Sequence, residues 1–386
     1  MTVAAPAIER IAPSGDLTSD VLDTRVDDGA CFPIIDATGC TFAYRGAVIS
    51  VRLIHFGVGF PDDLDFEQVA DSEWWLLALR VPPGSRLEYK LEVTDSFGTT
   101  VVEDPLNDRH ASHPFGANSV CEAAGYAEPR WVVTDPDVPA GRLVEFELES
   151  AALGRTTSAS VYLPAGFTLD GDGCYPLLVV HDGSDYIAYA SAATVFDNLI
   201  HDGEMPPAVV ALVRPFERLV EYADDPRHAE HLTGELVPAL ERELPLVATP
   251  AGRCLVGASF GAVASLSAAW RAPGFFGRLL LQSGSFAGAG TGCRRRPEPL
   301  WRPVRQFVRA YLDQPAAVAE RIFVTCGTYE SLICENRGLV PVLEGTGMTV
   351  RFAERLDGHN WACWRDSLGV ALPWLLATDD ASRGLE

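Results

Sequence analysis

The sequence predicts an α/β fold preceded by an all-β region, and two patterns carry this prediction. Up to about residue 125, short segments of β-forming residues are separated by turns rich in Pro and Gly, which is typical of antiparallel strands. Beyond that point, short continuous apolar runs alternate with helical segments, which indicates a mostly parallel sheet covered on both faces. A chain of 386 residues is also too long for one small domain, so we expect two.

Local composition divides the chain into four parts. Residues 1–30 are expected to form a lead-in with at most one short helix, and residues 31–130 an all-β sandwich. Residues 131–143 are rich in Pro, Asp and Gly and are predicted to be a linker. Residues 144–386 are then the α/β domain.

Four segments support the β-sandwich. Gly46–His55 and Trp74–Arg80 have the apolar, β-branched and aromatic content of strands, and Leu87–Val93 alternates with period two, as a half-buried strand does. Val81–Ser85, with its Pro-Pro-Gly, is predicted to be a turn.

The α/β domain is predicted from buried strands and the helices between them. The expected strands are Pro176–Val180, Pro207–Val213, Cys254–Gly257, Leu279–Gln282 and Ile322–Thr325, and the expected helices include Glu230–Leu244, Ala262–Trp270 and Arg365–Leu376.

The charge balance excludes some partners. A formal net charge of -23 argues against binding to nucleic acid or to an anionic membrane, since both need a basic face.

The nine cysteines show no CxxC spacing, so neither a zinc cluster nor a redox dithiol is indicated, and we expect reduced thiols. Together with a first stretch that lacks the pattern of a secretory signal, this predicts a cytoplasmic protein.

The strongest chemical signal is Gly257-Ala-Ser-Phe-Gly261, which lies between a predicted strand and a predicted helix. Strand, sharp turn and helix together are the context of a nucleophile elbow, in which glycines leave room for a strained serine. Ser259 is therefore the predicted nucleophile. The alternative is a tight turn with a buried serine.

A base and an acid should follow the serine in chain order. His359 is the only histidine after Ser259 and lies just before the last predicted helix. Glu330 is the first carboxylate after the penultimate core strand and is the predicted acid. Glu335 is the second choice, while Asp357 is too close to His359 in sequence for an easy orienting hydrogen bond.

The oxyanion hole needs two backbone donors. The N–H of Phe260, directly after the nucleophile, is one, and the N–H of Asp182 or Gly183 in the loop after an early strand is the other. His228 and His231 have no evident third ligand, so no metal site and no cofactor are predicted.

Several of these segments together resemble the enterochelin (enterobactin) esterase family of the esterase D-like α/β-hydrolases. The matching segments are Leu178–Tyr186, Arg218–Tyr222, Gly234–Pro238, Gly257–Gly261, Gln282–Ser285, Gly327–Leu332 and Gly358–Arg365. The resemblance implies an α/β-hydrolase domain behind an N-terminal early-set, Ig-like sandwich that helps to shape the substrate cleft. Tyr222 stands where the family usually has Leu, and Asn360 where Asp is frequent.

The resemblance also implies the substrate, a small-molecule ester of the ferric enterobactin type, which is anionic. An acidic protein then needs a local basic pocket, for which Arg214, Arg218, Arg365 and the run Arg294–Arg296 are candidates, with Trp361 as a further substrate-binding residue.

The implied reaction is two-step acyl transfer, which would release iron inside the cell. The alternatives are a feruloyl or acetyl esterase acting on carbohydrate, an exported acyltransferase, and a degenerate hydrolase that only binds its ligand.

Overall fold

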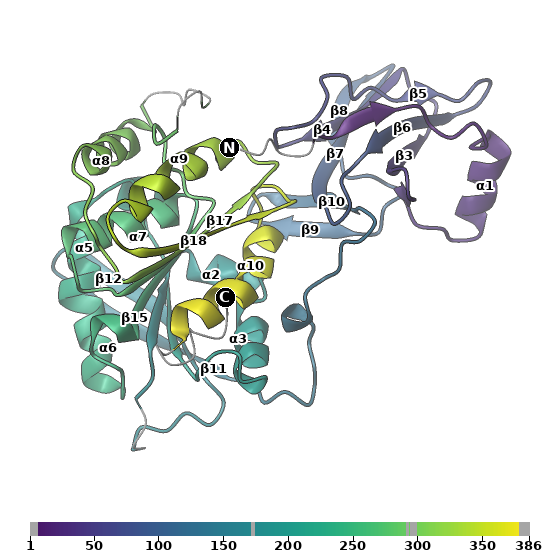
Figure 1. Ribbon diagram of the computed structural model, residues 1–386. Helices are drawn as coiled ribbons and strands as arrows, with labels where there is room; N and C mark the ends of the chain where they lie inside the picture. The colour runs from purple at the N-terminus through teal and green to yellow at the C-terminus, as the bar shows by residue number, and fades with distance from the viewer. Residues whose placement is uncertain (1–6, 171–173, 291–292, 294–298, 378–386) are drawn as a thin grey trace. The chain divides into compact units, whose positions relative to one another are not determined.

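The computed structural model describes residues 7–170, 174–290, 293 and 299–377 (Figure 1). The chain divides into two compact units. Unit 1 contains Met1–Ala127 together with two short segments from much later in the chain, Gly327–Glu330 and Arg355–Asn360, and unit 2 contains the rest. The two late segments lie inside the range predicted for the α/β domain.

Unit 1 is built from two antiparallel sheets, each with five strands among the described residues. One sheet has the order β1-β6-β3-β2 with β5 on β6, and the other has the order β4-β7-β10-β9 with β8 on β7. The strands are β1 (Glu9–Ile11), β2 (Ile34–Ile35), β3 (Cys40–Arg45), β4 (Ser50–His55), β5 (Glu67–Gln68), β6 (Trp74–Arg80), β7 (Arg86–Asp95), β8 (Gly98–Val102), β9 (His110–His113) and β10 (Gly116–Glu122).

The two sheets share one core. Phe42 and Leu79 from the first sheet belong to the same buried cluster as Leu53 and Leu91 from the second. In β7 the buried and half-buried positions alternate over the predicted strand, because one side of the strand faces this core. Burying such side chains stabilises the fold by about 1.5–3 kcal/mol each.

Strand β6 is buried on both sides, although most strands of this unit are buried on one. Its Leu77 and Leu79 face the shared core, while Trp74 and Leu76 pack in a second cluster with Leu22 of α1 (Ser19–Asp27). The lead-in predicted for residues 1–30 therefore contributes to the fold, since α1 covers the outer side of β6 and β1 extends the sheet.

Unit 2 is built around one eight-stranded sheet, with the order β11-β12-β14-β13-β15-β16-β17-β18 among the described residues. The strands from β14 to β17 are parallel, while β11 and β12 are antiparallel additions at one edge. The strands are β11 (Arg142–Ser150), β12 (Arg155–Leu163), β13 (Leu177–Val180), β14 (Val209–Val213), β15 (Arg253–Ala258), β16 (Arg278–Gln282), β17 (Arg321–Gly327) and β18 (Thr349–Arg355).

Helices cover both faces of this sheet (Figure 1). They are α2 (Gly183–Tyr189), α3 (Ala192–His201), α4 (Arg218–Glu221), α5 (Pro226–Glu230), α6 (Val237–Glu243), α7 (Phe260–Arg271), α8 (Arg302–Asp313), α9 (Ile333–Glu344) and α10 (Trp361–Leu376), with the short helices η1 (Arg130–Val132) and η3 (Pro250–Gly252) and a π-helical turn, η2 (His231–Leu236).

Burial on two faces explains the continuous apolar strands. In β13, Leu177 and Val179 belong to one buried cluster, with residues of α6, α7 and α8. Leu178 and Val180 belong to the other, with residues of α2, α3 and α10. Since successive side chains of a strand point to opposite faces, every position of β13 must be apolar.

Some predicted segments differ from the structure in their bounds or their continuity. Strand β4 begins at Ser50, four residues after the predicted start, and β11 begins inside the segment predicted as a linker. The single helix predicted over Glu230–Leu244 is a succession of α5, η2 and α6. Within the described parts of the chain, no helix has the length and apolar character needed to cross a membrane.

Candidate active site

Ser259 lies on a sharp turn between β15 and α7. Its φ of 57° and ψ of -118° lie in a region that residues with a side chain rarely adopt, so the backbone is strained at this point. The Ser259 N–H donates to the carbonyl of Gln282 at 2.9 Å, which ties the turn to the end of β16.

Of the two glycines beside Ser259, Gly257 is required by a close backbone contact, while Gly261 has a tight contact with a side chain. A Cβ atom on Gly257 would lie 2.2 Å from the carbonyl oxygen of Gly261, and one on Gly261 would lie 3.0 Å from Cβ of His181. The turn therefore accommodates a side chain at Ser259 but none at position 257 without movement of the backbone.

A second serine contacts the predicted nucleophile. The hydroxyl of Ser285 lies 3.1 Å from Oγ of Ser259, and the Ser285 N–H donates to the Ser259 carbonyl at 3.1 Å. Ser285 is 1% exposed, whereas Ser259 is half-buried. Gln282–Ser285 was matched to the family only as a strand end, and the contact itself was not predicted, because a contact between two loops has no local sequence signal.

The two candidates for the second oxyanion donor differ in their surroundings. The Asp182 N–H donates to the hydroxyl of Tyr222 at 3.2 Å. Gly183 is the first residue of α2, where a backbone N–H has no acceptor within its own helix. Tyr222, one of the departures from the family pattern, is thus the residue that engages the Asp182 N–H.

Glu330 and His359 lie next to each other in unit 1. Oε2 of Glu330 is 2.5 Å from Nδ1 of His359, and its Oε1 accepts the N–H of Gly327 at 2.7 Å. Glu330 is 1% exposed and thus buried, while His359 is exposed. A buried carboxylate on Nδ1 fixes the ring so that Nε2 is the atom available for proton transfer.

Neither of the other two carboxylates considered takes this position. Glu335 lies in the first turn of α9, and Asp357 accepts hydrogen bonds from Gly358 and Asn360. Ser259 is part of unit 2, whereas Glu330 and His359 are part of unit 1.

The arginines predicted to bind an anionic substrate have carboxylate partners. Arg218 donates to both oxygens of Asp182, from Nε at 2.8 Å and from Nη2 at 2.7 Å. Arg365 lies 3.0 Å from Glu128 and also contacts Asp366. Arg214 contacts Glu145 at 3.5 Å and donates to Ser160 at 2.7 Å, and the run Arg294–Arg296 lies outside the described residues.

Trp361 belongs to an aromatic cluster in unit 2. Its ring lies 5.3 Å from Tyr186 and 4.7 Å from Trp364, both in edge arrangements, and 5.9 Å from Tyr189. Trp361 and Tyr189 are half-buried, so part of each ring remains exposed.

Three buried histidines of unit 2, His181, His228 and His231, pair with one another or with a carboxylate. Nε2 of His181 lies 3.0 Å from Nε2 of His228, and His231 contacts Glu235 at 2.9 Å. Burial lowers the pKa of His181 to about 4 and that of His228 further below its usual value. These rings are therefore neutral at physiological pH, and the described residues contain no group of three or more side chains that could hold a metal ion.

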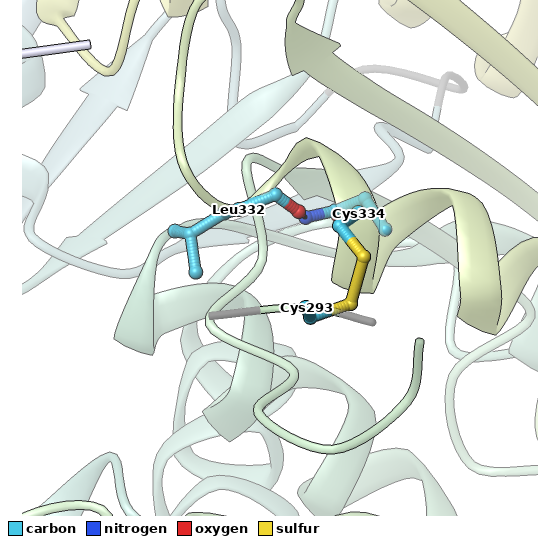
Figure 2. The surroundings of a disulfide bond; sticks show 4 residues. Cys293, Leu332 and Cys334 are labelled. Carbon is cyan, nitrogen blue, oxygen red and sulfur yellow. Dashed lines mark hydrogen bonds between the residues drawn. A yellow bond between two sulfur atoms is a disulfide. The ribbon is translucent and has the colours of Figure 1, made fainter. Parts of the chain in front are cut away.

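The expectation that all thiols are reduced is wrong for one pair. Cys293 and Cys334, 41 residues apart, form a disulfide with a Cα–Cα distance of 5.6 Å. Figure 2 shows this bond at the start of α9, next to Leu332. The spacing of the cysteines gave no sign of it, because the two segments meet only in the folded chain.

Comparison with known proteins decides the family. Residues 150–375 match the model of the Esterase family, described as "Putative esterase", which covers more than half of the chain. The chain belongs to the Esterase family. It is a carboxylic ester hydrolase with an α/β-hydrolase-like fold, as the sequence predicted, and it is similar to the enterochelin esterases.

The relatives of this esterase include iron(III) enterobactin esterases. The iron(III) enterobactin esterase of Dickeya dadantii (strain 3937) is 26% identical, over 83% of this chain and 71% of that protein. A crystal structure of ferric enterobactin esterase from Salmonella typhimurium has a TM-score of 0.72 at 21% identity and covers 88% of this chain and 95% of that one. A ferulic acid esterase has a TM-score of 0.54 at 20% identity and covers 61% of this chain and 98% of that one.

Proposed function

We propose that this esterase hydrolyses the ester bonds of a catecholate siderophore of the ferric enterobactin type. The extent of the similarity supports this choice. Likeness to the enterobactin esterases continues through most of the chain, whereas the ferulic acid esterase covers 61% of it. The additional part includes unit 1, whose two sheets around one core fit the early-set, Ig-like sandwich implied by the family.

The proposed mechanism is acyl transfer to Ser259. Nε2 of His359 takes the hydroxyl proton as Oγ attacks the ester carbonyl, and Glu330 stabilises the imidazolium through Nδ1–H. The N–H groups of Phe260 and Gly183 stabilise the oxyanion. His359 then protonates the leaving alcohol, and it next activates the water that releases the acid from Ser259.

The proposed substrate carries its own iron. Cleavage of the ester bonds that join the catecholate arms weakens chelation, because the arms no longer act as one ligand. A cytoplasmic location, which iron release inside the cell requires, is part of this proposal. The disulfide between Cys293 and Cys334 argues against this location, because disulfides are more common in oxidising compartments than in the cytoplasm.

Aromatic contacts are the best candidates for recognition of the acyl group. Because Arg214, Arg218 and Arg365 contact carboxylates, they supply little net positive charge for an anionic ligand. The exposed parts of Trp361 and Tyr189 can instead stack on a catechol ring.

Substrate comparison with a nucleophile variant tests the proposal. Purified protein is incubated with ferric enterobactin, a feruloyl ester and p-nitrophenyl butyrate, beside Ser259→Ala and the control Ser158→Ala in the same unit. We expect cleavage of ferric enterobactin by the wild type and by Ser158→Ala, and none by Ser259→Ala. Cleavage of the feruloyl ester alone would favour the carbohydrate esterase, and full activity in Ser259→Ala would remove the nucleophile from the proposal.

Substitution of two carboxylates, Glu330 and Glu335, tests which of them is the acid of the triad. Glu330→Gln keeps the shape of the side chain but no longer stabilises the imidazolium, so kcat should fall by about 100-fold or more with KM little changed. Glu335→Gln should retain a kcat close to that of the wild type. The reverse result would assign the role to Glu335.

A further inference from the structure

The two loops that carry Glu330 and His359 fold with the first third of the chain. The N–H of Val58 donates to the carbonyl of Tyr329 at 2.6 Å, and the N–H of Arg86 donates to the carbonyl of Leu356 at 2.9 Å. The loops also pair with each other, since the Tyr329 N–H donates to the carbonyl of Asp357 at 3.0 Å. Backbone bonds thus attach both loops to the β-sheets of unit 1.

Tyr329 anchors the first loop by its side chain. Its ring is 1% exposed and belongs to the shared core of the two sheets, and its hydroxyl lies 2.8 Å from Oγ of Ser85. A Cβ atom on Gly57 would lie 2.2 Å from the Tyr329 carbonyl, so the approach of this loop requires glycine there. Tyr329, which directly precedes Glu330, is therefore held both by its side chain and by its backbone carbonyl.

Asp357 anchors the second loop at the residues on either side of His359. Its Oδ1 accepts the N–H of Gly358 at 2.6 Å and the side-chain amide of Asn360 at 2.7 Å. The Asp357 side chain is only 4% exposed, so its charge needs a buried partner.

That partner is Arg86 at the start of β7. Its side chain is 6% exposed, and Nη1 lies 3.7 Å from Oδ2 of Asp357, 3.4 Å from Oδ1 of Asn360 and 2.9 Å from Oε1 of Glu88. One guanidinium thus faces one buried and one half-buried carboxylate, Asp357 and Glu88, and the amide that follows His359. Buried ion pairs of this kind contribute little net stability, but they favour one arrangement of the groups around them.

We propose that Arg86 and Asp357 are positioning residues for the catalytic histidine, with Arg86 fixing Asp357, and Asp357 fixing the backbone of Gly358 before His359 and the side chain of Asn360 after it. Their role is to keep Nδ1 of His359 on Glu330, and thus Nε2 in the direction that proton transfer needs. This inference rests on the proposed role of His359 as the base.

The test compares kinetics of Arg86→Met, Arg86→Lys, Asp357→Asn and His359→Ala with p-nitrophenyl butyrate. The control is Arg80→Met, which removes an exposed arginine of the same unit that pairs with Glu9. Because small displacements of a catalytic group are costly, we expect kcat of Arg86→Met and Asp357→Asn to fall by about 10- to 100-fold, with KM within about two-fold of the wild type. Arg86→Lys should recover part of the loss, and Arg80→Met should match the wild type.

Two results would overturn the inference. One is a wild-type kcat in folded Arg86→Met and Asp357→Asn, and the other is a loss confined to KM. If Arg86→Met does not fold, the nearly isosteric Asp357→Asn decides alone. Full activity in His359→Ala would instead refute the proposed function, whereas an inactive His359→Ala beside fully active Arg86 and Asp357 variants would refute the positioning role only.

Discussion

Two carboxylates, Glu330 and Asp357, belong to the surroundings of His359, and they have different environments and different contacts. Glu330 contacts the ring directly, while Asp357 binds the neighbours of His359 and faces Arg86. Asp357 is the closer of the two to His359 in sequence, but Glu330 is the one that contacts the imidazole ring. A hydrogen bond to Nδ1 needs a carboxylate that approaches the ring from a separate segment of chain, and the loop after β17 provides it.

The buried position of Asp357 gives the protein a specific pH dependence. Burial raises the pKa of this carboxyl to about 6, although Arg86 acts in the opposite direction. Since the folded state then binds the proton more tightly than the unfolded state does, this group's contribution to stability falls as the pH rises from about 4 to about 6. Asp357→Asn has no such titration. We expect the free energy of unfolding of the variant to improve relative to the wild type by up to about 3 kcal/mol between pH 4 and pH 7.5.

Denaturant unfolding of both proteins across this range measures the difference, and other titrating groups cancel in the comparison. A constant difference would show that Asp357 has an ordinary pKa. A difference that moves in favour of the wild type would show that Arg86 outweighs the cost of burial.

At the scale of single residues, the sequence predicted the pairing of Glu330 with His359, because the order of strands and loops fixes which loops meet. It did not predict the contact of Ser285 with Ser259 or that of Tyr222 with Asp182. Both depend on the packing of loops that are distant in sequence, for which no periodic pattern exists.

In the sheet of unit 2, the parallel strands that were predicted and the edge strands that were missed differ in burial. β13 to β17 were identified because strands buried on both faces are continuously apolar. β11 and β18 lie at the two edges of the sheet and carry many exposed or half-buried residues, so their sequences lack this signal. The π-helical turn η2 was missed since its side chains continue the apolar pattern of the helices beside it.

The turn between β15 and α7 has no room for a side chain at Gly257, and substitution of this residue tests that requirement. In Gly257→Ala the new methyl group would lie 2.2 Å from the carbonyl oxygen of Gly261, which is a contact with backbone. We expect the variant to lose about 1–3 kcal/mol of stability and most of its esterase activity, because the turn that presents Ser259 must shift. Thermal unfolding and p-nitrophenyl butyrate hydrolysis measure the two effects.

Gly234 in η2 is the matched control for this prediction. A Cβ atom there has only Cγ of Glu230 within 4.0 Å, so Gly234→Ala should keep its activity and leave the stability unchanged or raised by up to about 1 kcal/mol. Equal behaviour of the two variants would show that the turn accommodates a methyl group.

At the scale of the whole molecule, charge sets the conditions for the encounter with substrate. A net charge of -23 repels an anionic iron complex, and the arginines at positions 214, 218 and 365 are balanced by carboxylates. Salt weakens such repulsion, since the screening length falls from about 30 Å at 0.01 M to about 8 Å at 0.15 M.

We therefore expect kcat/KM for ferric enterobactin to rise several-fold over this range of ionic strength, while kcat/KM for neutral p-nitrophenyl butyrate stays within about two-fold. Steady-state kinetics in NaCl series with both substrates measure the effect. A fall of kcat/KM for the ferric complex with salt would indicate a local basic site that outweighs the overall charge.

The composition of unit 1 has a consequence for recombination between homologous genes. Because Gly327–Glu330 and Arg355–Asn360 fold with Met1–Ala127, a single crossover near residue 127 would join the Arg86 and Ser85 of one parent to the Asp357 and Tyr329 of the other. Functional chimaeras then require that both late segments be inherited with the N-terminal sequence. The three stretches form one unit of inheritance although some 200 residues separate the first from the second.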